Sequence, residues 1–301
     1  MFKRELISAL LLATSFGSSS VMAQSQSYAN PDLLVSAGAL TEAISSSGST
    51  GPNISGKSIV IVDVRPAEEF RKGHIPGAIN VDPNAVVAEE SPIDGDLLPS
   101  EAIGELFTEL GITHTSGVVF YDQSTGLHAA RMFWVSEYLG HTSASVLNGG
   151  LKAWIDNGGE LSTTKDQPPL TEGVFRATEV PRRYASADWL LDNSDDANTV
   201  VIDVRPSSLY DKGHIPWAVN IPWKGNVNAD GTMKSGEELA ARFKSHGIDP
   251  GTSVAVHCQS GLASSHSYFA LRLIGHPRVR VYHRSWSEWG NAEDLPKEVS
   301  G

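Results

Sequence analysis

The stretch Val62-Asp63-Val64-Arg65-Pro66 decides the fold, because the chain repeats it as Ile202-Asp203-Val204-Arg205-Pro206. Shortly after each copy, Lys72-Gly73-His74-Ile75-Pro76 is matched by Lys212-Gly213-His214-Ile215-Pro216. Both pairs of segments stand 140 positions apart without gaps. Self-similarity at one fixed offset indicates two copies of a single structural unit.

Each copy continues with the same series of short elements. Apolar, β-rich runs at 117–121 and 253–257 are typical of buried strands, and each is followed by a Gly-containing loop and a helical pattern. Alternating strands and helices predict the α/β class, with a parallel sheet covered by helices on both faces in each domain. We expect the first domain at 30–160, a linker at 161–182 and the second domain at 183–297.

Composition and the N-terminus bear on location and partners. The 301 residues carry a formal net charge of −12, which argues against nucleic acid or an anionic membrane as a partner. Lys3 and Arg4 precede an apolar run at 7–16, and small residues end at Ala23, as in an export signal. We therefore expect a signal peptide at 1–23 and a periplasmic or secreted protein that makes no membrane contact after cleavage.

The chain has one cysteine, Cys258, which therefore has no partner for an internal disulfide. A buried inert thiol and a reactive thiol are both compatible with that count. Its position favours reactivity, because Cys258 directly follows a predicted strand, where parallel sheets place their chemistry. The corresponding residue of the first copy is Asp122, which cannot accept sulfur and is interpreted as a helix N-cap or a loop anchor.

The residues after Cys258 are suited to holding a negatively charged sulfur. A helical pattern runs from about Ser264 to Ile274, and Gly261 lies in the loop before it. Amides at a helix start lack helical partners and can turn inward around an anion. We therefore expect the loop to stabilise a thiolate, and equally a persulfide, on Cys258.

At this point the chain resembles the tandem-domain rhodanese family, which includes thiosulfate and 3-mercaptopyruvate sulfurtransferases. Asp-Val-Arg-Pro and Gly-His-Ile-Pro in both halves, Cys258-x-x-Gly261, and the motif at 285–290 carry the resemblance. It implies two rhodanese-like domains, the first inactive and the second catalytic. It also implies that Cys258 takes a sulfane sulfur from thiosulfate or 3-mercaptopyruvate and passes it to cyanide or a thiol, without metal or cofactor. A monomer is favoured, although the oligomeric state is open.

The resemblance places the substrate-binding residues in the loop after the cysteine, at Gln259, Ser260, Gly261, Leu262 and Ala263. Many thiosulfate-using members have two basic residues directly after the cysteine, where this chain has neutral side chains. The Ser-Gly pair looks more like the mercaptopyruvate-using branch. These departures leave the donor open.

An anionic donor needs a positive group in its pocket. We hypothesise that Arg284, which stands where the family usually has glycine, supplies that charge; a solvated surface arginine is the alternative. His74, His214, Arg65 and Arg205 recur in both copies, including the copy without a thiol, and are interpreted as scaffold.

Two other functions fit parts of the sequence. Phosphatases of this fold use a Cys-x5-Arg loop, but Ser264 stands at the arginine position, so phosphoryl transfer is disfavoured. A periplasmic protein that binds sulfur, senses redox state or docks a partner without turnover stays open as the alternative to an enzyme.

Overall fold

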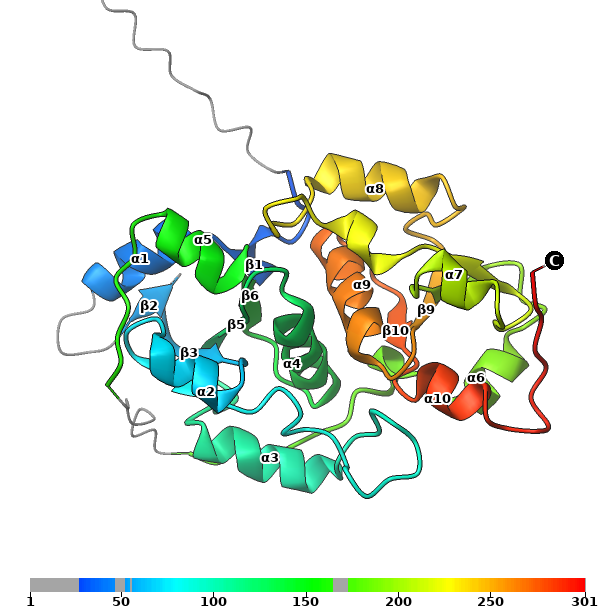
Figure 1. Ribbon diagram of the computed structural model, residues 1–301, viewed down its shortest axis with the longest axis horizontal. Helices are drawn as coiled ribbons and strands as arrows, with labels where there is room; N and C mark the ends of the chain where they lie inside the picture. Colours follow the sequence, from blue (N-terminus) through cyan, green and yellow to red (C-terminus); the bar gives the residue numbers. More distant parts are fainter. Residues whose placement is uncertain (1–26, 47–51, 55, 165–172, 301) are drawn as a thin grey trace, which may run out of the picture.

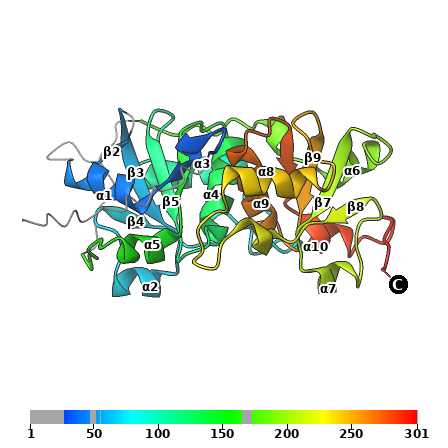
Figure 2. The same ribbon diagram turned by 90° about the horizontal axis from the view of Figure 1, so that it is seen from above.

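The structure is a computed structural model, and it describes residues 27–46, 52–54, 56–164 and 173–300. The expected signal peptide at 1–23 lies outside the described residues. Two α/β domains stand side by side along the long axis of the molecule (Figures 1 and 2). None of the helices in these ranges is long and apolar enough to cross a membrane.

The first domain is built on a mostly parallel sheet with the strand order β1-β6-β5-β3-β2, in which β4 also pairs with β3 and only β2 is antiparallel. Its strands are β1 (Leu34–Val35), β2 (Asn53–Ile54), β3 (Lys57–Asp63), β4 (Ala78–Asn80), β5 (Gly117–Tyr121) and β6 (Ala144–Leu147). Its helices are α1 (Ala37–Ser45), α2 (Ala67–Lys72), α3 (Ser100–Glu109), α4 (Leu127–Tyr138) and α5 (Gly150–Asp156), with a 3-10 turn η1 at Pro31–Leu33.

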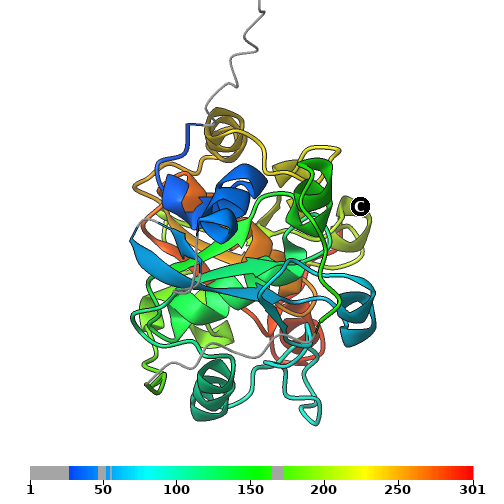
Figure 3. The same cartoon turned by 90° about the vertical axis from the view of Figure 1, so that its left-hand side faces the viewer.

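Side chains of β3 alternate between the two faces of this sheet, as the two-residue period of a strand requires. Ile59 and Ile61 pack with α1, α2 and α5 on one face, whereas Val60 and Val62 pack with α3 and α4 on the other. Figure 3 shows helices on both sides of the strands. The parallel sheet with two covered faces expected from the sequence is therefore confirmed.

The second domain repeats the core of this arrangement with the strand order β10-β9-β7-β8, all parallel. Its strands are β7 (Thr199–Asp203), β8 (Ala218–Asn220), β9 (Ser253–His257) and β10 (Val279–Val281). Its helices are α6 (Ala187–Asp192), α7 (Ser207–Tyr210), α8 (Gly236–Lys244), α9 (Leu262–Leu273) and α10 (Ser285–Trp289), with 3-10 turns η3 at Pro181–Arg183 and η4 at Trp223–Asn226.

Helices α4 and α9 face each other across the boundary between the domains (Figure 1). Phe133 of α4 packs edge-on against Phe269 of α9, with ring centroids 4.9 Å apart. Further along the same helices, Glu137 accepts a hydrogen bond of 2.8 Å from the guanidinium of Arg272. Apolar residues of both sheets join through this helix pair, so the domains share one continuous core.

The described part of the expected linker packs against the first domain. Phe175 is buried beside Phe107 of α3, and its amide donates to Thr108 Oγ1 at 3.0 Å. Residues 173–180 therefore belong to the packed body of the protein, and the chain enters the second domain from a fixed position.

Candidate active site

Cys258 lies at the point where the strand order of the second sheet reverses. The chain passes from β7 to β8 on one side and then returns to place β9 on the other. The loops that follow β7 and β9 therefore meet at the carboxyl edge of the sheet, the usual position for a site in an open parallel sheet. Cys258 is the first residue after β9, and α9 begins four residues later, at Leu262.

The Cys258 thiol is held inside the protein, with 4% of the residue exposed. Its backbone amide donates to Ser285 Oγ at 3.0 Å, and its sulfur lies 3.6 Å from Ser264 Oγ. Ser285 has a φ of 52°, in the left-handed region that residues with a Cβ seldom adopt. A buried serine held in this conformation against the cysteine is the kind of strain found at functional sites.

Helix α9 starts earlier than the sequence pattern predicted. Gly261 is its N-cap with φ at 81°, so the helix begins at Leu262 and not at Ser264. Ser264 and Ser265 consequently lie in the first turn; Ser265 Oγ donates to the Gly261 carbonyl at 2.8 Å. The left-handed glycine sets the boundary because it lets the loop turn sharply into the helix.

Three successive carbonyls of the loop are bound on its outer side. Those of Cys258 and Gln259 accept hydrogen bonds from the amides of Trp286 and Ser287, at 3.1 and 2.9 Å. The carbonyl of Ser260 accepts one of 3.0 Å from a guanidinium of the first domain. In a planar trans peptide the N–H points away from the C=O. The N–H groups of the same three peptides belong to Gln259, Ser260 and Gly261. They therefore point away from the groups that bind the carbonyls.

The first domain holds a carboxylate in the same kind of loop. Asp122 follows β5, and its side chain accepts hydrogen bonds from the amides of Ser124, Gly126 and His128, at 3.0, 2.9 and 3.0 Å. The carbonyl of Asp122 itself is bound on the outer side by the amide of Leu151 at 2.9 Å. Asp122 is thus a loop anchor, and the N-cap of α4 is Gly126.

In the part of the chain that the structure describes, the corresponding amides of the second loop have no protein acceptor. Gly261 and Ala263 hold the same positions relative to the N-cap glycine of α9 as Gly126 and His128 hold relative to that of α4. Ser260 is the third residue after β9, as Ser124 is the third residue after β5. Within the described ranges, none of these three donates to a protein atom. The loop around Cys258 therefore offers three amides to an anion, with no carboxylate in its place.

The repeated Asp-Val-Arg motif ties the loop after each first strand. Arg205 pairs with Asp203 at 2.6 Å and donates to the Gly213 carbonyl at 2.7 Å. Arg65 makes the same pair with Asp63 in the first domain. His257, beside Cys258, is fully covered, and burial lowers the pKa of its imidazole, which keeps it neutral.

Arg284, the residue expected to bind an anionic donor, is already paired with two carboxylates. It donates to Asp96 Oδ1 at 3.0 Å and to Glu288 Oε1 at 3.1 Å. His283 also donates to Asp96, at 3.0 Å, and this bond with those of Arg284 holds the pKa of the Asp96 carboxyl well below its usual range. These ion pairs offset the charge of Arg284, so the structure gives it a role in fastening the first domain to the second.

Of the residues predicted to bind substrate, Gln259, Ser260, Gly261, Leu262 and Ala263 form the turn around Cys258 and the start of α9. Gln259 is exposed, and its carbonyl also accepts a hydrogen bond of 2.7 Å from Ser287 Oγ. These five residues therefore form one turn, and their binding of substrate stays a prediction, while the sixth predicted residue, Arg284, is engaged elsewhere.

Sequence reasoning missed Arg131, which reaches this turn from α4 of the first domain. Its two terminal nitrogens donate to the carbonyls of Ser260 and Gly95, at 3.0 and 2.7 Å. Gly95 has a φ of 80°, and a Cβ there would lie 2.0 Å from the Ser260 carbonyl oxygen. The one sequence signal was an arginine inside the otherwise apolar run 129–135.

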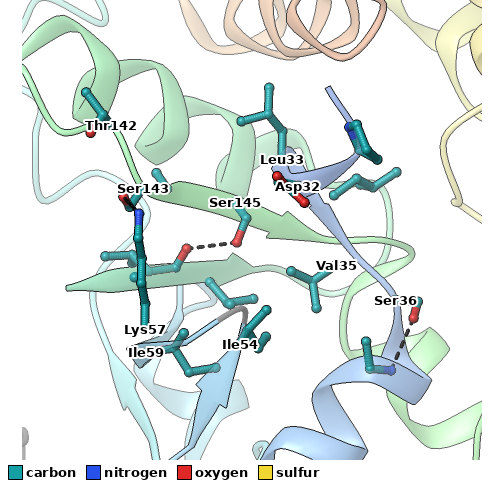
Figure 4. Close-up of a pocket in the computed structure, with 17 residues that line it drawn as sticks. Asp32, Leu33, Val35, Ser36, Ile54, Lys57, Ile59, Thr142, Ser143 and Ser145 are labelled. Carbon is teal, nitrogen blue, oxygen red and sulfur yellow. Dashed lines mark hydrogen bonds between the residues drawn. The ribbon is translucent and has the colours of Figure 1, made fainter. Parts of the chain in front are cut away.

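A hollow of about 390 Å³ in the first domain is unrelated to this site (Figure 4). It lies between residues 31–36, which form η1 and β1, and the starts of β3, β5 and β6, where Lys57 donates to Ser143 Oγ at 2.6 Å. Asp122 and its loop lie at the other ends of the strands. The hollow is thus at the edge where parallel sheets do not place their chemistry.

Comparisons with known proteins agree with this geometry. The rhodanese-like domain family matches residues 52–157 and 186–292. A thiosulfate sulfurtransferase of Azotobacter vinelandii is 32% identical over 254 residues, covering 82% of this chain and 93% of the relative. A 3-mercaptopyruvate sulfurtransferase of Escherichia coli K12 is 31% identical over 247 residues, covering 78% and 87%. The crystal structure of SseA from Escherichia coli, described as a rhodanese fold, superposes with a TM-score of 0.73 at 29% identity, covering 85% of this chain and 99% of that one.

Two α/β domains of the same design, one with a carboxylate and one with a thiol in the amide-lined loop, define a tandem-domain sulfurtransferase. The chain belongs to the rhodanese family. The fold class, the tandem organisation and the enzyme class expected from the sequence are confirmed.

Proposed function

We propose that the enzyme carries sulfur as a persulfide on Cys258, which receives it from a small anionic donor and passes it to a thiophilic acceptor. The amides of Ser260, Gly261 and Ala263 hold the outer, negatively charged sulfur. Covalent catalysis of this kind divides one difficult transfer into two easier displacements.

The hydrogen bonds of Asp122 are the observation that carries this proposal. In aspartate the carboxylate oxygens are two bonds beyond Cβ, and in a cysteine persulfide the outer sulfur is also two bonds beyond Cβ. The first domain therefore holds an anion at the position that the outer sulfur would take in the second. The three amides of the Cys258 loop are preorganised, so the loop does not have to become ordered when the negative charge of the persulfide forms.

The two steps balance without a cofactor. The Cys258 thiolate attacks the outer sulfur of thiosulfate; a sulfur–sulfur bond forms to Cys258, and sulfite leaves with the electron pair of the bond that breaks. Cyanide or a thiolate then attacks the outer sulfur of the persulfide, and the Cys258 thiolate is released with that electron pair. With 3-mercaptopyruvate, the carbon–sulfur bond breaks instead, and pyruvate is released after its enolate takes a proton.

We propose thiosulfate and 3-mercaptopyruvate as the donors to compare, since named relatives use each. The neutral side chains of Gln259 and Ser260 provide no charge of their own for a doubly charged donor. The singly charged 3-mercaptopyruvate makes the smaller demand on such a loop, and we expect it to be the better donor.

We further propose that the mature enzyme is an exported monomer, released after Ala23. The basic, apolar and small-residue segments of 1–23 support export. The mass of the chain recovered from the periplasm of an expressing bacterium tests the cleavage position, and sedimentation tests the monomer.

Intact mass measurement tests the central proposal. The protein is incubated with each donor, separated from it and weighed, with Cys258→Ser as the matched control. A gain of one sulfur in the wild type that is lost on adding cyanide, and is absent from the serine variant, is the expected result. A persulfide that no acceptor removes would favour the sulfur-binding alternative, and no gain with either donor would refute the persulfide.

A further inference from the structure

Arg131 is a buried cation of the first domain with an incomplete set of partners. Only 3% of the residue is exposed. Its terminal nitrogens bind the carbonyls of Ser260 and Gly95, and its Nε has no hydrogen-bond partner in the described structure. A guanidinium surrounded by carbonyls keeps its full charge inside the protein, which is costly unless an anion lies near.

The other loop is bound in the same way by a different residue. Arg131 and His266 are each the fifth residue after the left-handed glycine that starts their helix, so they occupy matching positions on α4 and α9. His266 Nε2 donates to the carbonyl of Thr125 at 3.1 Å, just before Gly126. Arg131 donates to the carbonyl just before Gly261. Each domain thus supports the loop of its neighbour.

The two supports differ in charge. Burial lowers the pKa of His266 to about 4, so the loop that already contains the Asp122 carboxylate receives a neutral partner. Burial lowers the pKa of Arg131 to about 10, while the charges of Cys258, Asp94 and Asp96 act to raise it, so it stays positive at neutral pH. The cation therefore lies beside the loop that contains the thiol.

We propose that Arg131, a residue of the domain without a thiol, is a positioning residue of the sulfur-transfer site and supplies its positive charge. Its hydrogen bond fixes the Ser260–Gly261 peptide with the carbonyl outward, so that the Gly261 amide points inward. In the first domain the matching amide, that of Gly126, donates to Asp122 at 2.9 Å. The positive charge stabilises the thiolate and, on the proposed function on which this inference rests, the persulfide.

The test is a pH titration of the Cys258 thiolate by its ultraviolet absorbance, measured as the difference from the same protein carrying Cys258→Ser. We expect Arg131→Gln to move the midpoint upward by about one pH unit or more, the effect of removing a nearby opposite charge. At neutral pH, kcat/KM for thiosulfate falls about tenfold in parallel. His266→Gln is the matched control, because it removes the same interdomain contact on the side of Asp122, and its midpoint stays at that of the wild type.

Two further variants keep the test decisive if Arg131→Gln does not fold. Arg131→Lys retains the charge, whereas Arg131→His copies the neutral partner found in the other domain. The midpoint is expected to be higher in the histidine variant than in the lysine variant; equal midpoints overturn the proposal, as does a wild-type midpoint in folded Arg131→Gln. The titration uses no sulfur donor, so a failure to form persulfide in the wild type refutes the proposed function separately.

Discussion

Gly95→Ala is expected to separate the segment around Gly95 from the loop that follows Cys258. A Cβ at position 95 would lie 2.0 Å from the carbonyl oxygen of Ser260, far inside contact distance, so the segment that carries it must move away. Movement breaks the hydrogen bond of 2.7 Å from the Arg131 guanidinium to the Gly95 carbonyl. Gly158→Ala is the matched control, since its φ of 82° resembles the 80° of Gly95 but its Cβ would meet nothing within 4 Å.

The expected loss of stability has two contributions, of which only the first applies to both variants. Placing alanine in the left-handed region costs about 1 to 2 kcal/mol at either position. The Gly95 variant also loses a hydrogen bond to a charged group, worth about 1.5 to 3 kcal/mol. We therefore expect the free energy of unfolding to fall by about 2.5 to 5 kcal/mol in Gly95→Ala and by about 1 to 2 kcal/mol in Gly158→Ala.

Urea unfolding followed by tryptophan fluorescence measures the difference, and steady-state sulfur transfer measures its effect on catalysis. We expect kcat/KM to fall about tenfold in Gly95→Ala only, because Arg131 loses one of its two anchors. Equal stability losses in the two variants, with full activity in both, would refute the close approach of the loop to Ser260.

Three further predictions concern single residues. Ser285→Ala and Ser285→Gly both remove the hydroxyl that accepts a hydrogen bond from the Cys258 amide, so both should transfer sulfur more slowly. The glycine variant should unfold at a higher denaturant concentration than the alanine variant, because glycine adopts a positive φ without strain. Asp122→Ala leaves three amides without their acceptor and should cost about 2 to 4 kcal/mol in urea unfolding, with little change in the rate at Cys258. The folded pKa of His266, about 4, lies below its unfolded value, so its contribution to stability is complete above about pH 6.5 and is lost as the pH falls toward 4. As the pH falls from about 6.5 to about 4, His266→Gln should therefore lose less stability than the wild type. Melting temperatures of the two proteins that fall in parallel over this range would contradict the prediction.

Much of the fold was readable because its signals are local or repeated. The strands at 117–121 and 253–257 are short apolar runs. The repeat aligned the loops that follow them, so Cys258 and Asp122 were identified as equivalent positions. The start of α9 was misplaced because it depends on the backbone conformation of Gly261, which composition does not reveal.

Contacts between the domains could not be predicted in the same way. Arg131 and Ser260 are distant in sequence, and no periodic pattern connects them. The hypothesis that Arg284 is the missing cation came from its replacing the glycine that usually precedes the motif at 285–290, but Asp96 of the first domain binds its guanidinium. A charged residue within an apolar helix, as at position 131, is the local sign of such a contact, since burial of a charge requires a partner.

The continuous core through α4 and α9 limits how the two halves can evolve after duplication. The half that lacks a thiol still covers one side of its neighbour, so deleting it would leave an apolar flank open to aggregation. The facing helices, and the loops that they bind across the boundary, must change together. The domain without a thiol is therefore needed for the packing of its neighbour, whatever chemistry it performs itself.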